Sequence, residues 1–164
     1  GDDGNDQGAQ IGDAAPRTLY VRRDVLNADE IIAWAKAQGF KTTIPADDMH
    51  VTIAFSREPV DWMKMGEGWP ERVEVAAGGA RIMEQFGQAR VLLFASSELS
   101  WRHEDMKREG ASWDHPDYQP HVTISYDPDA PDLVEVEPYK GKIILGPEIF
   151  EEVKEDWQEQ ISEE

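Results

Sequence analysis

The chain has 164 residues, of which 40% are hydrophobic and 30% are charged, and its formal net charge at pH 7 is −18. This length predicts one domain with a sizeable core, and the acidic balance argues against a protein that binds long nucleic acid, because such proteins carry basic patches. The absence of cysteine excludes disulfides, thiolate zinc sites and cysteine nucleophiles, and no apolar run is long enough to predict a membrane span.

The two ends of the chain differ in composition from the middle. Residues 1–16 are rich in Gly, Asp and Gln and carry four acidic residues, which predicts a disordered tail or linker. We expect the folded domain at residues 17–157 and an acidic C-terminal tail at residues 158–164. Because the first residue is Gly1, we expect either a trimmed tag or a piece of a longer polypeptide.

The first half of the chain predicts a strand, a helix and a second strand. Alternating polar and apolar residues predict a strand over residues 17–23. Residues 27–30 have the pattern of a capping box and predict the start of a helix that Gly39 ends. A loop then leads to a strand that begins at His50.

After this strand, residues 59–70 predict a loop with some strand character. Three strands are then expected, at residues 72–77, 80–86 and 90–95. The Gly78-Gly79 pair predicts a hairpin between the first two of them.

The last third predicts a second helix and three strands. The helix is expected over residues 97–108, with Gly110 ending it. A polar and aromatic loop leads to a strand that begins at His121. Two final strands are expected at residues 142–145 and 148–154, joined by a hairpin around Gly146-Pro147.

This order of elements favours an α+β fold with antiparallel sheets over a doubly wound parallel fold. Strand, helix and His-containing strand occur in both halves, and His50 and His121 lie 71 positions apart (121 − 50). The repeated order predicts an internal duplication with pseudo-twofold symmetry. We expect two lobes, each with an antiparallel sheet, that face one central cleft and have flanking helices.

One phrase is repeated almost unchanged in the two halves. His50-Val51-Thr52-Ile53 recurs at residues 121–124, and an aromatic residue follows two positions later each time. In a strand, residues i and i+2 point to the same face. The repeat therefore predicts two His-Thr pairs, His50 with Thr52 and His121 with Thr123, each with core residues behind it.

Two such pairs in one cleft suit the cleavage of a phosphodiester. One proton must leave the attacking oxygen and another must reach the leaving oxygen, and imidazole performs both tasks near neutral pH. Threonine hydroxyls can donate to the non-bridging oxygens as charge develops there. A single His-x-Thr segment is usually structural, but two nearly identical copies predict a shared site. A two-histidine zinc site would need a third ligand, and we expect neither a metal nor another cofactor.

These residues resemble the 2H phosphoesterase superfamily, which is named for its two His-x-Thr/Ser motifs. The chain resembles most closely the phage anti-CBASS nucleases, which destroy the cyclic oligonucleotide signals of bacterial CBASS immunity. The resemblance covers residues 17–157. It is carried by RTLYVRRDVLNADEIIAWAKAQGF, IPADDMHVTIAFSREPVDW, YQPHVTISYD and GPEIFEEVKEDW.

The resemblance implies a bilobal fold and metal-independent hydrolysis of 3′–5′ bonds in cyclic di- and trinucleotides. It implies that His50, Thr52, His121 and Thr123 carry the reaction, with a ribose 2′-hydroxyl as nucleophile and a 2′,3′-cyclic phosphate as intermediate. The two histidines are expected to exchange the roles of acid and base between the two steps. The expected setting is the cytoplasm of an infected bacterium.

Members of this family also clamp nucleobases with aromatic and acidic side chains. Tyr20 is the candidate for base stacking, with a core tyrosine as the alternative. Glu148 is the candidate acceptor for a base amino group, with a solvated acid as the alternative. Trp69 and Trp113 lie in predicted loops that can close over a base, and burial is the alternative for each.

The remaining candidates are cations and histidines. Arg22 and Arg57 are candidates to neutralise a phosphate, against the default of a solvated arginine. His115 lies near the second motif and is a candidate ligand contact. His103 lies in a highly charged predicted helix, and we expect it to be exposed.

Two other functions remain open at this point. One is an enzyme of RNA ends from the same superfamily, a 2′,3′-cyclic phosphodiesterase or a 2′–5′ ligase, although the acidic balance disfavours long RNA. The other is a nucleotide sponge that binds without turnover, against which the intact His-Thr pairs argue. The sequence leaves open the oligomeric state and the preferred cyclic nucleotide.

Overall fold

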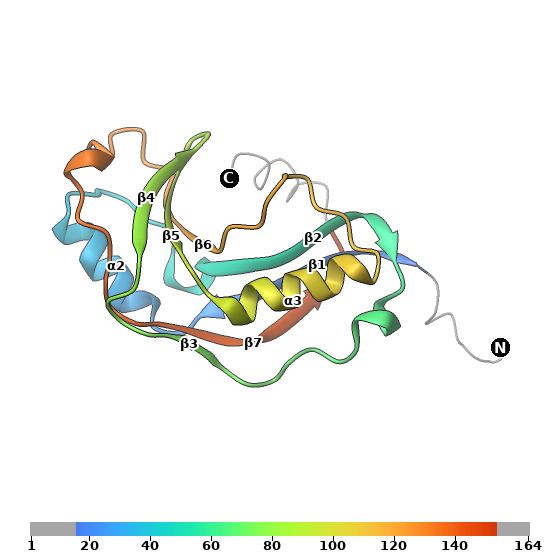
Figure 1. Ribbon diagram of the computed structural model, residues 1–164. Helices are drawn as coiled ribbons and strands as arrows, with labels where there is room; N and C mark the ends of the chain where they lie inside the picture. Colours follow the sequence, from blue (N-terminus) through green and yellow to red (C-terminus); the bar gives the residue numbers. More distant parts are fainter. Residues whose placement is uncertain (1–15, 154–164) are drawn as a thin grey trace.

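The computed structural model describes residues 16–153, which form two antiparallel sheets with two α-helices (Figure 1). The elements in chain order are β1 (Arg17–Val25), α2 (Ala28–Ala37), η2 (Ala46–Asp48), β2 (His50–Val60), η3 (Trp62–Met65), β3 (Val73–Val75), β4 (Arg81–Phe86), β5 (Ala89–Phe94), α3 (Ser97–Arg108), β6 (His121–Ser125), η4 (Leu133–Glu135) and β7 (Ile143–Glu151). The predicted N-terminal tail apart from Pro16 and the predicted C-terminal tail lie outside the described residues. No helix of the described part is long and apolar enough to cross a membrane.

The strand order confirms the predicted α+β class with two antiparallel sheets. The larger sheet has the order β2-β1-β7-β3 and the smaller one β4-β5-β6, and every strand pair is antiparallel. The strands that begin at His50 and His121 are each an outer strand of their own sheet. These two outer strands, β2 and β6, contact each other. The two copies of the repeated phrase therefore meet where the sheets adjoin.

The core is apolar because each sheet turns its β-branched and aliphatic residues inward. Leu19 and Val21 of β1 and Val51 and Ile53 of β2 are all 0% exposed. Helix α3 contacts β2 and lies over the larger sheet in Figure 1, while α2 lies near its far end. The motif strands are therefore held from behind by tightly packed apolar side chains.

Both α-helices fall where the sequence predicts them. Helix α3 has the predicted bounds, and Ser96 caps it by accepting a hydrogen bond from the Leu99 N–H at 3.3 Å. Gly39 and Gly110 follow the two helices with positive φ angles of 107° and 113°, a conformation that glycine adopts most easily.

The predicted capping box of α2 does not form. The Asn27 side chain makes no capping bond to the helix. Its Oδ1 accepts from the Ile144 N–H at 3.0 Å, and its Nδ2 donates to the Lys142 carbonyl at 2.9 Å. The Asn27 amide thus attaches the start of the helix to the β7 region. The predicted capping hydrogen bond is therefore wrong, although the helix begins where expected.

The predicted hairpin at Gly78-Gly79 is also wrong. Strand β3 pairs with β7 in the larger sheet, with Val73 opposite Leu145, whereas β4 pairs with β5 in the smaller sheet. The glycines therefore lie where the chain passes from one sheet to the other. The hairpin of this region joins β4 to β5 around Gly87, whose φ is 58°.

The second predicted hairpin, around Gly146-Pro147, is wrong as well. The chain runs through these residues as one strand, β7. Against β1, the pairing jumps from Leu145 opposite Val25 to Glu148 opposite Arg23. Gly146 and Pro147 lie in this irregularity, where a proline without an N–H group is tolerated within a strand.

Candidate active site

The two predicted His-Thr pairs lie at the starts of β2 and β6. His50 and Thr52 share one face of β2, and His121 and Thr123 share one face of β6, because two positions separate the members of each pair. The threonines are 8% and 7% exposed, and the two imidazoles are half-buried. The side chains therefore sit at the edge of the core and still reach solvent.

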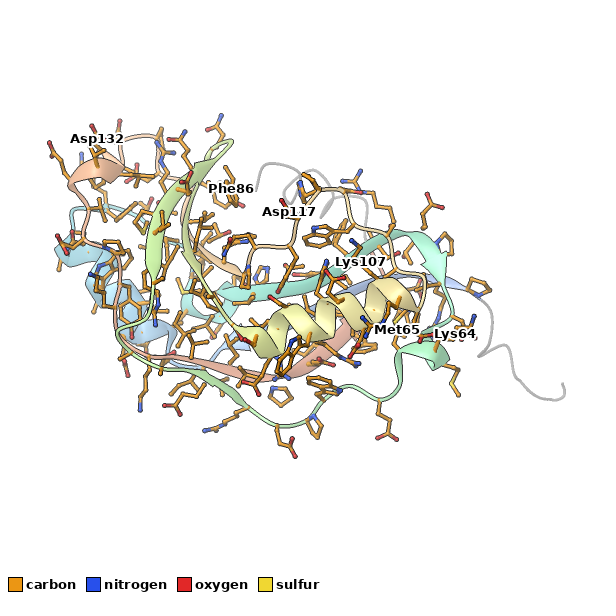
Figure 2. The ribbon with its side chains drawn as sticks, in the orientation of Figure 1. Lys64, Met65, Phe86, Lys107, Asp117 and Asp132 are labelled. Atoms are coloured by element: carbon orange, nitrogen blue, oxygen red, sulfur yellow. The ribbon has the colours of Figure 1, made fainter. Side chains whose placement is uncertain are left out.

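A cavity of about 390 Å³ is lined by one residue of each motif. Its lining residues are Thr52, Phe55, Arg57, Phe86, Trp113, Asp114, His115, Asp117, Gln119 and His121. Thr52 comes from the first motif and His121 from the second, whereas His50 and Thr123 are not among the lining residues. Figure 2 labels Phe86 near the end of β4 and Asp117 in the loop before β6, two contributions from the second half.

Both motif histidines are oriented by a backbone carbonyl two residues earlier. Nδ1 of His50 lies 2.7 Å from the Asp48 carbonyl oxygen, and Nδ1 of His121 lies 2.9 Å from that of Gln119. A carbonyl oxygen can only accept, so each neutral ring carries its proton on Nδ1. The Nε2 atom of each ring is then the basic nitrogen, and either ring can serve as base when neutral or as acid when protonated.

Each of these imidazoles also meets the edge of an aromatic ring. The centroid of the Tyr20 ring lies 6.3 Å from that of His50, and the Phe86 ring lies 5.4 Å from that of His121, both nearly perpendicular. Such edge-on contacts restrict rotation of the imidazoles without offering a competing proton acceptor from the ring. The two halves of the site are therefore built in the same way.

The outer wall of the cavity carries charge. The Arg57 guanidinium donates to the Asp114 carboxylate at 3.0 Å, with both side chains 40% exposed. The Trp113 indole N–H donates to the Asp117 carbonyl at 2.9 Å and so closes the loop that carries these aspartates. Apolar rings thus form one part of the cavity, and a paired arginine with two carboxylates forms another.

Of the predicted binding residues, Trp113 lines the cavity, as do the further candidates Arg57 and His115. Glu148 is engaged elsewhere. Its side chain is 0% exposed and accepts from Nε and Nη2 of Arg102 at 2.9 and 3.0 Å. A carboxylate buried in this way does not reach a base, so the predicted role of Glu148 is corrected to a structural one.

Trp69 contacts the Glu148–Arg102 pair, although Trp69 itself is 37% exposed. Its backbone N–H donates to Glu148 Oε1 at 2.9 Å, and the Arg102 guanidinium lies 4.7 Å from the centroid of its ring. Trp69 does not line the cavity of the two motifs. The structure therefore does not place Trp69 over a base bound in this cavity.

The structure also corrects the predictions for Tyr20 and Arg22. Tyr20 is 3% exposed and contacts the rings of His50 and Phe55, so it supports the site from the core and has no free face for a base. Arg22 forms ion pairs with Glu151 at 2.7 Å and Asp24 at 3.2 Å. The hydrogen bonds to these carboxylates raise its pKa against the opposing effect of burial, and it does not line the cavity.

His103 is buried and not exposed as predicted. It is 1% exposed, and its Nδ1 lies 2.7 Å from the Ile53 carbonyl oxygen. Burial lowers its pKa from the ordinary value of 6.5. The Tyr118 ring stacks on it at 4.2 Å between centroids.

Several cavity residues are absent from the sequence-based prediction. Phe55 and Phe86 supply apolar walls, and Asp114, Asp117 and Gln119 supply polar groups. Phe55 carried a signal, since an aromatic residue follows both copies of the phrase at the same position. No pattern in the sequence pointed to Phe86, because it lies at the end of β4 and reaches His121 of β6 only in the folded smaller sheet. Within residues 16–153, no three His, Cys, Asp or Glu side chains are grouped to hold a metal ion.

A family model described as "Anti-CBASS protein Acb1" matches residues 17–160. Proteins with the same description from Sphingomonas paeninsulae and Caulobacter sp. (strain RHG1) are 63% and 56% identical over 154 and 156 residues. These matches cover 90% and 92% of this chain but 25% of each relative, so the chain spans about a quarter of their length. A relative from Enterobacteria phage T4 is 30% identical over 151 residues, covering 87% of this chain and 93% of its own.

Solved structures of similar fold include LigT from E. coli. The chain described as LigT complexed with NADP+ has a TM-score of 0.59 and 16% identity, covering 82% of this chain and 86% of that one. The chain described as LigT complexed with 3′-AMP has a TM-score of 0.55 at 16% identity, covering 85% and 96%. At this identity the likeness establishes the fold, and it confirms the predicted two-sheet architecture.

Proposed function

Because this chain belongs to the Acb1 family of anti-CBASS proteins, we propose that it is a phosphodiesterase that destroys cyclic oligonucleotide immune signals. The reaction is hydrolysis of 3′–5′ bonds in cyclic di- and trinucleotides, without a metal, in the cytoplasm of a bacterium under phage attack. Loss of the signal lets the phage evade CBASS. The position of Thr52 and His121 on one cavity supports this proposal most directly.

The two imidazoles divide the proton transfers. In the first step, Nε2 of one neutral histidine takes the proton of a ribose 2′-hydroxyl, and the 2′-oxygen attacks phosphorus. The other histidine, protonated, gives its proton to the 5′-oxygen as the P–O5′ bond breaks. In the second step a water opens the 2′,3′-cyclic phosphate with the roles reversed. The matching carbonyl contacts of His50 and His121 suit this exchange, because each contact is made by Nδ1 and makes Nε2 the basic nitrogen of the neutral ring.

The threonines act on the phosphate and not on the protons. A Thr52 or Thr123 hydroxyl can donate to a non-bridging oxygen, where negative charge grows in the transition state. Both are nearly buried, at 8% and 7% exposure, so water competes weakly for these donors. This is the arrangement in which a hydroxyl contributes most to the rate.

The cavity suits one nucleoside unit of such a substrate. Its volume of about 390 Å³ lies within the range of small-molecule sites. Phe55, Phe86 and Trp113 offer apolar surface for a base, and the carboxylates of Asp114 and Asp117 can accept from its amino group. Carboxylates would repel a phosphate, so the phosphate is expected on the His-Thr side of the cavity.

Incubation with 3′,3′-cyclic dinucleotides and cyclic trinucleotides in EDTA tests the proposal, with products read by liquid chromatography and mass spectrometry. We expect linear products. Thr52→Val keeps the shape of the side chain and removes the hydroxyl, and it should lower the rate by roughly 10². Glu84→Ala, at an exposed position of β4 outside the cavity, is the matched control and should keep the wild-type rate.

The same panel separates the alternatives. Intact cyclic substrates after incubation with folded protein would contradict the proposal. Faster turnover of RNA that ends in a 2′,3′-cyclic phosphate would favour an enzyme of RNA ends. Recovery of bound, unchanged cyclic nucleotide after denaturing the complex would favour a sponge.

A further inference from the structure

The two motif strands share an irregularity at the same place. On β2 the pairing with β1 passes from Ala54 opposite Val21 to Thr52 opposite Arg22, so Ile53 is an extra residue. This is the arrangement of a β-bulge, which bends a strand and redirects the side chains next to it. It directly follows Thr52, the first hydroxyl of the site.

On β6 the same residue of the phrase is extra. The pairing with β5 passes from Ser125 opposite Arg90 to Thr123 opposite Val91, which leaves Ile124 without an opposite residue. Both motif strands are outer strands of their sheets, so no further strand accepts their outward backbone groups. A buried carbonyl at such a bulge needs another hydrogen-bond donor.

The two halves supply this donor differently. The Ile124 carbonyl accepts from the backbone N–H of Ile44 at 2.8 Å. The equivalent Ile53 carbonyl accepts from the side chain of His103 on α3, with 2.7 Å between Nδ1 and the oxygen. The second motif is therefore held by a backbone group that any residue provides, while the first depends on one side chain.

The position of the His103 ring is tightly determined. It stacks on the Tyr118 ring, with centroids 4.2 Å apart and an interplanar angle of 12°, and it meets the Trp113 ring edge-on at 4.7 Å. The Tyr118 hydroxyl donates to the Thr52 carbonyl at 2.8 Å. Consecutive carbonyls, those of Thr52 and Ile53, are thus held by two stacked side chains from the second half of the chain.

The hydrogen-bonding state of the ring is also fixed. A carbonyl oxygen can only accept, so His103 carries its proton on Nδ1. Its Nε2 is buried and has no hydrogen-bond partner among the described residues. The ring therefore has one polar task in the structure, which is to donate to the Ile53 carbonyl.

We propose that His103 is a positioning residue for the first motif, which holds the Ile53 bulge through its Nδ1–H and thereby aims the Thr52 hydroxyl into the cavity. This inference rests on the proposed phosphodiesterase function and adds a residue that acts through the strand and does not touch substrate. Misplacement of a contacting group by about 1 Å can cost about 10² in rate. Loss of the His103 contact should therefore appear in kcat more than in KM.

Two substitutions separate the hydrogen bond from the packing. His103→Asn places an amide N–H near the position of Nδ1, whereas His103→Leu fills the space and has no donor. We expect His103→Leu to lower kcat for a cyclic dinucleotide about tenfold with KM within about twofold, and His103→Asn to recover most of the loss.

Met106→Ala is the control, because Met106 is a fully buried residue of the same helix outside the cavity of the two motifs. It should lower stability and leave kcat near wild type where all variants are folded.

Wild-type kcat in folded His103→Leu overturns the proposal. So does an equal loss in His103→Asn and His103→Leu, because packing and not the hydrogen bond would then be responsible. A readout without turnover distinguishes this failure from failure of the proposed function. Nitrogen-15 NMR of the wild type should show the Nδ1–H form of His103, and the Thr52 amide signal should shift in His103→Leu and return in His103→Asn. An unmoved Thr52 signal in His103→Leu counts against positioning, even if the wild type cleaves no cyclic nucleotide.

Discussion

Each motif histidine is oriented by a backbone carbonyl two residues upstream. The Asp48 and Gln119 carbonyls accept from Nδ1 of His50 and His121. A carbonyl two residues upstream is present whatever side chain stands there, so the orientation of each ring is determined by the path of the chain. The Asp48 carboxylate is not needed for it.

This distinction gives a prediction at the histidines. His50→Ala and His121→Ala should each lower kcat by about 10² or more, the usual contribution of a general acid or base. Asp48→Ala changes an exposed side chain and keeps the carbonyl, so it should leave kcat within about twofold. Initial rates with a cyclic dinucleotide measure all three. A loss in Asp48→Ala as large as in His50→Ala would show that the carboxylate takes part.

A second prediction concerns the buried ion pair of Glu148 and Arg102. Glu148→Gln leaves the Arg102 charge in the interior without its partner, and removal of one member of a buried pair is strongly destabilising. We expect a loss of about 3 kcal/mol in the free energy of unfolding, measured with urea. KM for the cyclic dinucleotide should not change under folding conditions, because Glu148 does not line the cavity.

The control for this substitution is an exposed ion pair that also contains a glutamate. Glu74 and Lys142 lie 3.9 Å apart, with side chains 58% and 51% exposed. Glu74→Gln should cost less than about 1 kcal/mol, since exposed pairs contribute little. Similar losses in both variants would contradict the structural role of Glu148.

At the scale of elements, local patterns predicted what is local. The alternation in the repeated phrase gives both motif strands, and the bounds of α3 follow from its helical pattern and Gly110. The pairing of β3 with β7 joins Val73 to Leu145, which are 72 positions apart (145 − 73), and no short pattern encodes it. A Gly-Gly pair looks the same in a hairpin and in a crossing between sheets.

The same limit applies to the site. The four motif residues could be singled out because the period of a strand puts each pair on one face, and two of them, Thr52 and His121, line the cavity. Phe86 and Asp117 reach the cavity only through tertiary folding. The burial of His103 did have a local signal. Leu99, His103 and Met106 follow the i, i+4, i+7 spacing of one helix face, and all three are buried. The high charge of the neighbouring positions concealed this face.

The packing of α3 on β2 predicts a dependence of stability on pH. Burial lowers the pKa of His103 from 6.5, so the folded state keeps the ring neutral at a pH where the unfolded chain binds a proton. The stability from this group is complete above about pH 6.5 and is lost as the pH falls below it. The other groups facing the ring are Glu104 and Lys107 on α3, which oppose each other in their effect on this pKa, and the Tyr118 hydroxyl, whose pKa burial raises.

Urea unfolding at pH 7.5 and 5.5 measures this dependence. We expect wild type to lose about 1 kcal/mol more than His103→Asn between the two conditions, since asparagine does not titrate and one pKa unit corresponds to about 1.4 kcal/mol. An equal loss in the two proteins would assign the acid sensitivity to other groups.

For the whole molecule, the main physical fact is the charge of −18. In the formal count, which leaves out the chain termini, residues 1–16 contribute −4, from four acidic residues. A substrate with two phosphates therefore approaches a surface of its own sign. The cavity adds one arginine that is already paired with Asp114.

Residues 148–164 contribute −7 (one lysine against eight acidic residues), and residues 17–147 carry the remaining −7 (−18 + 4 + 7). The acidity is thus concentrated at the two ends, which carry −11 of the −18, and the middle of the chain is acidic as well. Such a field does not attract a long polyanion, and capture of a small anionic substrate depends on contacts inside the cavity.

The sign of this field predicts how salt affects the rate. Salt screens the repulsion between the acidic protein and a dianionic cyclic dinucleotide, so kcat/KM should rise about two- to threefold from roughly 20 to 200 mM NaCl. At saturating substrate, kcat should stay constant, because it does not include the encounter, and this serves as the internal control. Proteins that neutralise phosphates with basic residues show the opposite trend. A fall in kcat/KM with salt would therefore mean that local cations such as Arg57 dominate the approach of the substrate.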